Sequence, residues 1–471
     1  MTGLWSEREL AAAVGAAPSA PLSAVVRGVS IDSRTLEAGD LFIAIKGDAH
    51  DGHDHLARAF ESGAVAAIVS RKHAARLAAL GPLFAVDDTL SAMERLGVAA
   101  RARSNARIVA VTGSVGKTTA KEMLRAMLSA CGATHASAQS YNNHWGVPLT
   151  LARMAASAHF GVFEIGMNHA GEIAPLSRMV RPHAALVTTI APVHIEHLGS
   201  IEAIADAKAE IFLGLEPGGT AALNRDAPQF ERLAKAAAAR GVRVVTFGRG
   251  EDCDARLIEL EASDGGSRVR ARVLGRELAF VVGAPGAHMA ENALGALLAA
   301  DALGADIDPC AAALERFAPQ QGRGARFSVA TPDGPAIIID ESYNANPASM
   351  RAALKLLAAA KPGPKGRRIA VIGDMLELGP AAEAMHAELA ADLSANRVDL
   401  LFGAGPLTRA LYEAAPASMR AAWTARSNEL TDEVARELRG GDIAMIKGSN
   451  GSRMGPLVAA LRDRFARGQG G

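Results

Sequence analysis

A glycine-containing loop between a predicted strand and a predicted helix constrains this chain more than any other feature. The strand covers residues 108–111, the loop reads Thr-Gly-Ser-Val-Gly-Lys-Thr-Thr from Thr112 to Thr119, and apolar residues then recur with helical spacing. The glycines allow backbone N–H groups to point at an anion, and the helix adds about half a positive charge at its N-terminus. Lys117 can reach outer phosphates and Thr118 can bind Mg²⁺. The loop therefore predicts ATP or GTP chemistry in an α/β fold.

This loop is shorter at its front than the full phosphate-loop consensus, because Val111 stands at the position of the first glycine. An ordinary glycine turn between a strand and a helix therefore stays open as an alternative. On the functional interpretation, the nucleotide phosphates are held by Gly113, Ser114, Val115, Gly116, Lys117, Thr118 and Thr119.

The composition is that of a globular protein without a polyanionic partner. The 471 residues suggest about three domains of roughly 150 residues each, and 49% of them are hydrophobic. The 50 basic and 50 acidic residues are interspersed, so we expect neither a nucleic-acid surface nor an acidic tail. The three cysteines match no zinc or disulfide spacing, which indicates a reducing compartment. Because no segment resembles a signal peptide or a membrane span, a cytoplasmic protein is expected.

Three domains are expected, at residues 1–104, 105–318 and 319–471. The second alternates apolar runs with helices, which is typical of a parallel sheet covered on both faces, and ends in short runs that predict a small antiparallel addition. The third follows a polar linker and repeats the alternation as a second doubly wound unit. The main strands are expected at residues 40–45, 64–69, 108–111, 161–165, 184–190, 220–223, 243–247, 336–339, 369–372, 399–402 and 443–446.

Residues 340–353 carry clear sequence signals for a connection from a strand to a helix. Asn346 is a good N-cap, Pro347 suits the first helical position, and an apolar stripe follows. The segment from Asp340 to Asn344 therefore lies at the carboxyl end of a strand, where open α/β sheets bind ligands.

Glu164 and His194 follow the second and third strands of the predicted central sheet. A carboxylate at this edge can face a Mg²⁺ ion held by Thr118. Each residue also has a structural interpretation, because a glutamate at a strand end is commonly solvated and a lone histidine is commonly structural.

Further short motifs occur along nearly the whole chain. They are Gly28 to Arg34, Gly39 to Phe42, Asp51 to His53, Asn142 to Pro148, Glu164 to Met167, His194 to Gly199, Lys208 to Ile211, Gly286 to His288 with Asn292, Tyr343 to Pro347, Gly373 to Gly379 and Lys447 to Ser449. In this order and spacing, together with the phosphate loop, they resemble the ATP-dependent Mur ligases of peptidoglycan synthesis. The resemblance implies a small N-terminal α/β domain that binds a UDP substrate, a central P-loop domain with a parallel sheet, and a C-terminal Rossmann-like domain.

Within this family the motifs are most similar to those of the members that join D-alanyl-D-alanine to UDP-N-acetylmuramoyl-tripeptide and release ADP and phosphate. In the implied reaction the substrate's terminal carboxylate attacks the γ-phosphate of ATP, and an amine then converts the acyl phosphate to an amide. Lys117 and Mg²⁺ would neutralise the two anions in a dry cleft among the domains. The third residue of the peptide, diaminopimelate or lysine, stays open, as does the general base. A monomer without nucleic-acid or membrane partners is expected.

The resemblance also implies catalytic residues and metal ligands. Besides Lys117, they are Thr118 and Glu164 for one Mg²⁺, and His194 and Lys208 for a second near the acyl phosphate. An ammonium cannot bind a cation, so Lys208 is expected to be carbamylated, as the matching lysine is in related ligases. The alternative is a surface lysine that pairs with an acidic neighbour on its helix, Asp206 or Glu210.

Other matching positions are implied to bind the substrates. Those for ATP are Asn143 near the γ-phosphate, His288 and Asn292 beside the nucleotide, Arg323 between domains, and Asp340, Tyr343, Asn344 and Asn346 from the third domain. Those for the UDP end are Ser33, Arg34, Lys46 and Gly47. Plain alternatives remain for several of them: Asn292 in a core helix, Asn346 as a cap only, Tyr343 in packing, and a turn with a solvated arginine at Ser33 and Arg34.

Other nucleotide-dependent functions would require motifs that this sequence lacks. The tripeptide-forming Mur ligase and a folylpolyglutamate synthase-like ligase are the nearest, but the Asp-Asn-Pro-Arg motif expected of a diaminopimelate-selecting enzyme is absent from the sequence. A GTP-driven switch would need an Asn-Lys-x-Asp element, which is also absent. A noncatalytic nucleotide-binding scaffold is disfavoured because the sequence contains the full set of expected catalytic residues, Lys117, Thr118, Glu164, His194 and Lys208.

Overall fold

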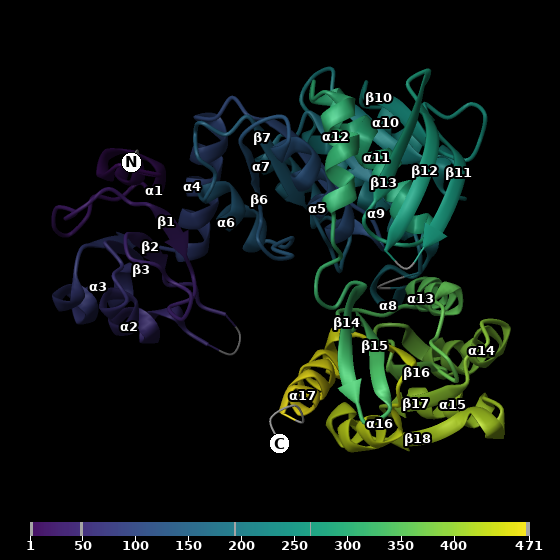
Figure 1. Cartoon of the computed structure of the whole chain (residues 1–471). Helices are drawn as coiled ribbons and strands as arrows, with labels where there is room; N and C mark the ends of the chain where they lie inside the picture. Colours follow the sequence, from purple (N-terminus) through teal and green to yellow (C-terminus); the bar gives the residue numbers. More distant parts are fainter. Residues whose placement is uncertain (1–2, 48–49, 193–194, 264, 468–471) are drawn as a thin grey trace.

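The computed structural model describes residues 3–47, 50–192, 195–263 and 265–467. The described residues form three β-sheets, which follow one another along the chain. Figure 1 shows them in three lobes, with the N-terminal lobe beside the central one and the C-terminal lobe below it. We define the N-terminal lobe as residues 7–102, the central lobe as 107–313 and the C-terminal lobe as 325–467. The domain boundaries predicted at residues 104 and 318 remain predictions.

The N-terminal lobe contains a parallel sheet in the order β1-β2-β3-β4. The predicted strands at 40–45 and 64–69 are confirmed: the first ends two residues earlier, the second begins two residues later and ends one residue later, and two short strands flank them. The strands are β1 (Gly28–Ser30), β2 (Asp40–Ile43), β3 (Ala66–Ser70) and β4 (Leu83–Val86), and the helices are α1 (Glu7–Val14), α2 (Leu56–Glu61), α3 (Arg71–Leu77) and α4 (Thr89–Ala102).

The central lobe contains a larger sheet, in the order β13-β12-β11-β10-β9-β8-β5-β7-β6. Its strands are β5 (Arg107–Thr112), β6 (Thr134–Ala136), β7 (Phe160–Glu164), β8 (Ala184–Val187), β9 (Thr220–Asn224), β10 (Arg243–Gly248), β11 (Ala255–Ser263), β12 (Gly266–Val273) and β13 (Arg276–Val282). The helices are α5 (Lys117–Ser129), α6 (Gly146–Ala152), α7 (Ile173–Val180), α8 (Ile195–Leu198), α9 (Ile201–Ala209), α10 (Phe230–Ala238), α11 (Ala287–Ala302) and α12 (Ile307–Ala313).

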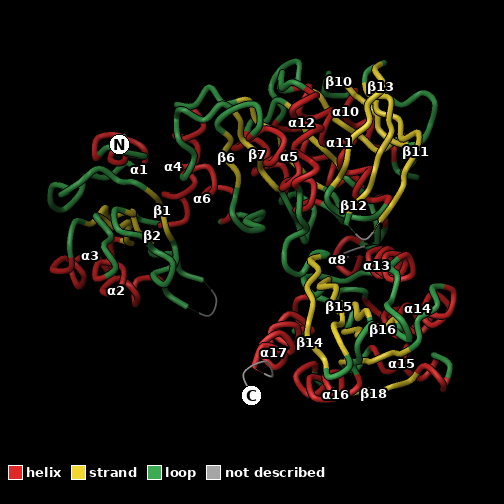
Figure 2. The backbone as a smooth tube through the Cα atoms, in the orientation of Figure 1, coloured by secondary structure: helices red, strands yellow, loops and turns green. Residues whose placement is uncertain are grey.

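Helices cover both faces of this sheet, as predicted. Val109 and Val111 of β5 pack on one side with α5, α11 and α12, whereas Ile108 and Ala110 pack on the other with α6, α7, α9 and α10. The antiparallel addition is also confirmed, since β11, β12 and β13 pair antiparallel to one another. Figures 1 and 2 show these three strands on the side of the central lobe away from the N-terminal lobe.

Strand β8 ends at Val187, three residues before its predicted end. The next two residues hold the phosphate loop instead of extending the strand. Thr188 Oγ1 donates to Val115 O at 2.6 Å, and Ser114 N donates to Thr189 O at 2.6 Å. The apolar run therefore continues past the strand because it supports the loop.

The N-terminal and central lobes share one hydrophobic core. Leu149 and Ala152 of α6 pack in the same cluster as Leu41 and Ile43 of β2. In addition, the indole N–H of Trp5 donates to Ala152 O at 2.9 Å. The two lobes are therefore joined by buried contacts and not by the linking chain alone.

The C-terminal lobe contains a sheet in the order β14-β15-β19-β16-β17-β18, parallel except for the pair β14–β15. The predicted strands are confirmed, and β14 and β18 are additional. The strands are β14 (Ala325–Thr331), β15 (Gly334–Glu341), β16 (Arg368–Gly373), β17 (Leu400–Ala404), β18 (Arg420–Thr424) and β19 (Ile443–Lys447), and the helices are α13 (Pro347–Ala359), α14 (Ala382–Ala395), α15 (Thr408–Ala414), α16 (Thr431–Glu437) and α17 (Met454–Arg467).

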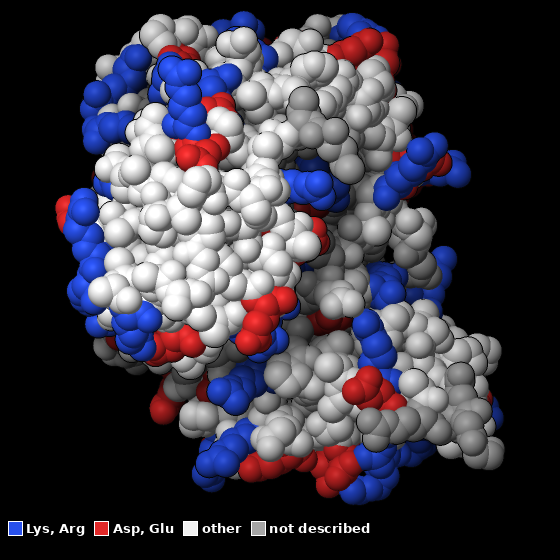
Figure 3. Space-filling view, turned by 90° about the vertical axis from the view of Figure 1, so that its left-hand side faces the viewer, with Lys and Arg blue, Asp and Glu red and all other residues white. Residues whose placement is uncertain are grey.

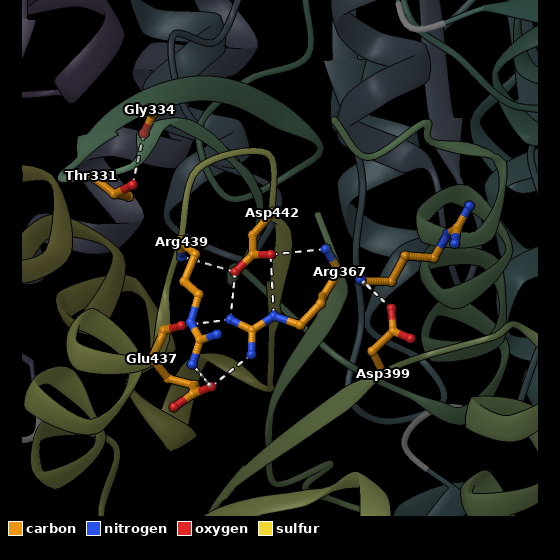
Figure 4. Close-up of polar contacts among 8 residues, drawn as sticks. Thr331, Gly334, Arg367, Asp399, Glu437, Arg439 and Asp442 are labelled. Carbon is orange, nitrogen blue, oxygen red and sulfur yellow. Dashed lines mark hydrogen bonds and ion pairs between the residues drawn. The ribbon is translucent and has the colours of Figure 1, made fainter. Parts of the chain in front are cut away.

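A charged network closes the amino ends of β16 and β19 (Figure 4). Arg367 Nη2 lies 2.8 Å from Asp442 Oδ2, and Arg367 Nη1 lies 2.6 Å from Glu437 Oε1. Asp442 is buried, so the guanidinium compensates a carboxylate that water does not reach. Parallel strands point their carboxyl ends to the other edge, which leaves that edge open toward the central lobe.

Short 3-10 turns link several elements, at Gly52–His55, Ala78–Leu80, Glu210–Gly214, Leu314–Arg316, Gly379–Ala381, Ala417–Met419, Ser427–Leu430 and Asn450–Ser452. No helix in the described part of the chain is both long enough and apolar enough to span a bilayer.

Candidate active site

The phosphate loop has the backbone conformation that its glycines were predicted to allow. Gly113 has a φ of 147° and Gly116, which caps α5, has a φ of 87°. A Cβ atom on Gly113 would lie 2.0 Å from Thr188 Oγ1, and one on Gly116 would lie 2.8 Å from Asn292 Nδ2. Both positions therefore require glycine for conformation and for space. Val111 is fully buried in β5, which explains why the motif begins later than its consensus.

Lys117 is the first residue of α5, and its ammonium donates to Gly113 O at 2.9 Å. Burial lowers the pKa of Lys117; the carboxylate of Glu164 raises it, and the guanidinium of Arg323 lowers it. The ammonium thus lies across the mouth of the loop, among charges from three segments of the chain.

Four side chains next to the loop form one polar network. Thr118 Oγ1 donates to Glu164 Oε2 at 2.7 Å, and Asn142 Nδ2 donates to Glu164 Oε1 at 2.7 Å. The hydroxyl of Ser140 lies 2.7 Å from Thr118 Oγ1 and 3.5 Å from Glu164 Oε2. The structure thus brings the predicted pair, Thr118 and Glu164, into direct contact, and Glu164 is buried and hydrogen-bonded, not solvated.

This network presents the oxygen donors that Mg²⁺ prefers. The carboxylate of Glu164 and the hydroxyls of Thr118 and Ser140 converge beside the phosphate loop, so the residues present fit a magnesium ion. His194, the predicted ligand of a second ion, lies outside the described residues.

Lys208 is buried in α9 with 1% of its surface exposed. The alternative of a surface lysine is therefore wrong, and its two proposed partners bind elsewhere: Asp206 pairs with Arg232, and Glu210 accepts from Gly171 N and Ala174 N. Burial holds the pKa of Lys208 well below its usual value, and the charge of Lys117 lowers it further.

A cavity of about 500 Å³ opens between the central and C-terminal lobes. The space-filling view shows a hollow between the upper and lower parts of the molecule, with basic side chains in its wall (Figure 3). The predicted residues that line the cavity are Ser114, Val115, Gly116, Lys117, Thr118, Thr119, Glu164, His288, Asn292, Arg323, Tyr343, Asn344 and Asn346. One cavity thus collects residues from both lobes.

Arg323 connects the two walls of the cavity. Its Nη2 donates to Ser140 Oγ at 3.1 Å, and its guanidinium stacks 3.8 Å from the ring centre of Tyr343. Tyr343 is exposed, so it is not packed in a core as the alternative held. A cation held over an aromatic face in this way is fixed in orientation.

Lys447 and Glu341 form a second charged pair in the cavity. Lys447 Nζ lies 3.3 Å from Glu341 Oε2 and donates to Asn344 O at 2.9 Å. His288 lies on the opposite wall, in the central lobe, and burial lowers its pKa. The carboxylate of Glu341 raises this pKa, and the ammonium of Lys447 lowers it. His288 of the central lobe is therefore within electrostatic reach of the C-terminal wall.

Three residues predicted to bind ATP accept hydrogen bonds from backbone N–H groups. Two of them, Asp340 and Asn143, do not line the cavity. Asp340 accepts from Gly322 N at 2.8 Å and from the Ser342 hydroxyl at 2.6 Å. Asn143 accepts from Gly146 N at 2.9 Å, and it is the preceding Asn142 that lines the cavity. Asn346 caps α13 through Ser349 N, as predicted, and also lines the cavity.

The residues predicted to bind the UDP end do not line this cavity. Ser33 is buried in a turn, and Arg34 is 74% exposed and pairs with Asp32 at 2.7 Å. That is the arrangement of the alternative interpretation, a turn with a solvated arginine. Lys46 and Gly47 are exposed on a loop of the same lobe.

A cluster in the N-terminal lobe brings together Asp51, His53 and His73, whose possible ligand atoms lie within 4.8 Å of one another. Ser70 N donates to His53 Nε2 at 2.9 Å, so the ring proton lies on Nδ1, 2.5 Å from Asp51 Oδ1. A metal on Nδ1 would move that proton to Nε2, where the amide N–H already points. The pair is therefore a structural hydrogen bond, not a metal centre.

Sequence reasoning missed several residues of the cavity and one, Ser140, of the polar network beside it. Asn142 and Lys447 lay within recognised motifs but received no role, and Ser140 was not noticed. Ser140 follows β6, whose neighbour β7 ends at Glu164 on the same edge of the sheet, but the three-residue β6 carries no periodic signal in the sequence. A usable signal existed for Asn224, which follows the predicted strand at 220–223 and lines the cavity.

Three family models match the sequence. They are the Mur ligase family catalytic domain over residues 25–128, the Mur ligase middle domain over 111–300, and the Mur ligase glutamate ligase domain over 325–450.

Curated relatives and solved structures match over almost the full chain. UDP-N-acetylmuramoyl-tripeptide–D-alanyl-D-alanine ligase of Bacillus subtilis is 33% identical over 93% of this chain and 93% of the relative. The enzyme of the same description from Escherichia coli is 34% identical over 92% and 93%. The crystal structure of MurF from Acinetobacter baumannii superposes with a TM-score of 0.83 at 28% identity, covering 98% of this chain and 99% of that one.

Proposed function

The chain belongs to the Mur ligase family, and on that premise we propose that it joins D-alanyl-D-alanine to UDP-N-acetylmuramoyl-tripeptide. ATP is cleaved to ADP and phosphate, and the product is the UDP-linked pentapeptide. The observation that carries this proposal is a cavity that is lined both by Lys117, Thr118 and Glu164 of the central lobe and by Arg323 and Asn344. The names of relatives that match over more than nine-tenths of their length support the choice of substrates.

The chemical difficulty in this reaction is to bring a carboxylate against a triphosphate. Lys117 and Arg323 supply two positive charges to the region where the anions meet, and the amide groups of the phosphate loop add donors that need no reorganisation. The lowered pKa of Lys117 reflects burial among these charges, and an anion bound there would restore it.

We propose that Thr118, Glu164 and Ser140 hold one Mg²⁺ and that His194 and Lys208 hold another. Mg²⁺ bound there would withdraw charge from the phosphoryl oxygens. The mutual hydrogen bonds of Thr118, Ser140 and Glu164 support the first set, because they keep three oxygen donors together beside the loop.

The lysine in the second set requires carbamylation. Only a neutral amine reacts with carbon dioxide, and the lowered pKa of Lys208 increases the neutral fraction. No acidic side chain in the described part of the chain lies within ion-pair distance of Lys208, so its ammonium gains nothing from staying charged.

The UDP end of the substrate is proposed to bind the N-terminal lobe through Ser33, Arg34, Lys46 and Gly47. Arg34 is the only one of the four with a guanidinium, which suits a diphosphate, and its high exposure leaves it accessible. We further propose that the enzyme acts as a monomer, because one chain supplies both walls of the cavity.

The test is the transfer of heavy oxygen from the tripeptide's terminal carboxylate into inorganic phosphate. We expect labelled phosphate only when ATP, the UDP-tripeptide and D-alanyl-D-alanine are all present. Unlabelled phosphate, or phosphate release at the same rate without the dipeptide, would contradict the proposal. Activity with a UDP-dipeptide and diaminopimelate instead would identify the tripeptide-forming reaction, and activity with a folate substrate would identify the folylpolyglutamate synthase-like reaction.

A further inference from the structure

Two of the three cysteines lie side by side, although they are far apart in the sequence. Cys131 follows the C-terminus of α5, and Cys310 lies in α12, 179 residues later. Their sulfur atoms are 3.6 Å apart, and both cysteines are free thiols. The third cysteine, Cys253, lies in the segment between β10 and β11 and is also free.

The two thiols differ in their surroundings. Cys310 is fully buried in the core formed by α5, α11 and α12, and its sulfur donates to Met127 O at 3.6 Å. Cys131 is partly exposed at the edge of that core, and its sulfur donates to Asp306 O at 3.7 Å. Solvent can therefore reach one sulfur, and the other is held against it by packing.

We propose that Cys131 and Cys310 form an oxidisable dithiol that hydrogen peroxide converts into a disulfide bond between α5 and α12. The thiolate of Cys131 attacks one peroxide oxygen, the O–O bond breaks, and hydroxide leaves, giving a sulfenic acid. The thiol of Cys310 then attacks this sulfur, the S–O bond breaks, and water leaves with the thiol proton. Peroxide is reduced, and the two sulfurs are oxidised by two electrons in all.

The distance and the reactivity order both fit this step. A disulfide needs the sulfurs to approach to about 2 Å, a further movement of about 1.5 Å between a side chain just beyond the end of α5 and one within α12. Burial, with the adjacent Cys131, raises the pKa of Cys310, so the buried thiol stays protonated and acts as the resolving group. The partly exposed thiol of Cys131 meets the oxidant first.

The bond would join α5, whose first residues line the candidate active site, to α12, which lies outside it. Helix α5 begins at Lys117, and α12 follows α11, which carries His288 and Asn292. At about 1.5 Å per residue, Cys131 lies roughly 20 Å from Lys117 along α5. We therefore expect the oxidised protein to resist heat better and to keep its nucleotide affinity.

The experiment treats the folded full-length chain with a small excess of hydrogen peroxide and identifies the products by intact mass and peptide mapping. We expect the loss of two hydrogens, a peptide pair linked through Cys131 and Cys310, and a free Cys253. Dithiothreitol should reverse the change. Cys131→Ser and Cys310→Ser should each prevent the linked product, whereas Cys253→Ser is the matched control and should form it normally.

Three outcomes would overturn the inference. One is overoxidation of Cys131 to sulfinic acid with Cys310 still reduced, and another is a link that involves Cys253. The third is a purely intermolecular bond, seen as a dimer on non-reducing gels. The measurement on the unmodified chain decides among them even if a serine variant fails to fold.

Discussion

Ser140 connects side chains that come from three separate segments of the chain. Its hydroxyl contacts Thr118 of the phosphate loop and Glu164 at the end of β7, and it accepts from Arg323 after the central lobe. A small hydroxyl can serve all three because it both donates and accepts. The charged groups around the phosphate loop are thereby held in one arrangement before any ligand binds.

We predict that Ser140→Ala lowers kcat/KM by about 10- to 100-fold, the usual effect of removing hydrogen bonds to charged groups. Steady-state kinetics across a range of magnesium concentrations would measure it. Ser137→Ala is the control, since the buried hydroxyl of Ser137 has no hydrogen-bond partner among the described residues. Equal losses in both variants would mean that Ser140 matters only for folding.

Lys117 is the one basic residue of the phosphate loop, Thr112 to Thr119. We predict that Lys117→Ala reduces turnover at least about a thousandfold, equivalent to about 4 kcal/mol of transition-state stabilisation. Stability should change little, because the ammonium makes a single hydrogen bond, to Gly113 O. Phosphate-release kinetics with a parallel thermal melt would check both parts, and near-normal turnover would remove Lys117 from the mechanism.

Lys208 gives a prediction that distinguishes carbamylation from a structural role. Lys208→Ala should lose most activity and regain part of it with added short-chain carboxylic acids, which replace the missing carbamate. Lys235→Ala, an exposed lysine on α10, should be unaffected with or without the acids. A complete absence of rescue in a well-folded variant would count against carbamylation.

At the scale of elements, His183 fixes how β8 meets β5. Its Nδ1 accepts from Ile108 N at 3.0 Å, which requires a neutral ring. Burial and the nearby Arg107 and Arg101 lower the pKa of His183 from 6.5 to about 4. Protonation would turn this acceptor into a donor that faces another donor.

The sign of the pH effect follows from this lowered pKa. Above pH 6.5 the ring is neutral in both the folded and the unfolded chain, so it adds no pH dependence. As the pH falls from 6.5 toward 4, only the unfolded chain gains the proton, and stability decreases by about 2 kcal/mol after allowance for solvent screening. His183→Asn keeps an acceptor that does not titrate, and its melting temperature should decrease less over that range. Identical pH profiles would contradict the prediction.

Elements with strong local signals were predictable from sequence. Helix α13 begins at Pro347 behind Asn346, as expected, because N-cap and proline preferences act within one turn. The short strands β1, β4 and β6 were not predicted, since runs of three or four residues carry almost no periodicity. Edge strand β14 was not predicted because alternating exposed residues hide its apolar face, and β18 was not predicted because it is short and none of its residues is fully buried.

At the scale of the whole molecule, the lobes are connected in two different ways. The N-terminal and central lobes share a packed core, and Arg153 Nε donates to Val29 O at 2.6 Å across their junction. The C-terminal lobe meets the central lobe around the polar cavity instead. A packed core resists movement, whereas a ligand can close a polar cavity.

We therefore predict that substrate binding moves the C-terminal lobe and leaves the other two lobes fixed to each other. Dye-labelled cysteines at the exposed positions Arg58, Lys235 and Glu388, in a Cys131→Ser background, would report the distances. With ATP analogue and UDP-tripeptide, the 235–388 distance should shorten and the 58–235 distance should stay constant. The opposite result would place the hinge on the other side of the central lobe.

The sequence predicted the order of the three α/β units and most side chains of the phosphate site, because loop and strand ends are local features. It did not predict the shared core of the first two lobes, which depends on packing between Trp5 and α6, far apart in the chain. The resemblance implied Asn143 at the nucleotide, whereas in the structure Asn142 lines the cavity and Asn143 does not. Ser140 and Arg323 meet only in the folded chain.

The packed junction between the first two lobes has a consequence for substrate choice. Because Trp5 and α6 fasten the N-terminal lobe in place, the span from Arg34 to the phosphate loop is set by the fold. If the nucleotide end docks at Arg34, a peptide of the right length alone brings its terminal carboxylate to Lys117. The enzyme then selects its UDP-peptide substrate by length as well as by chemical identity.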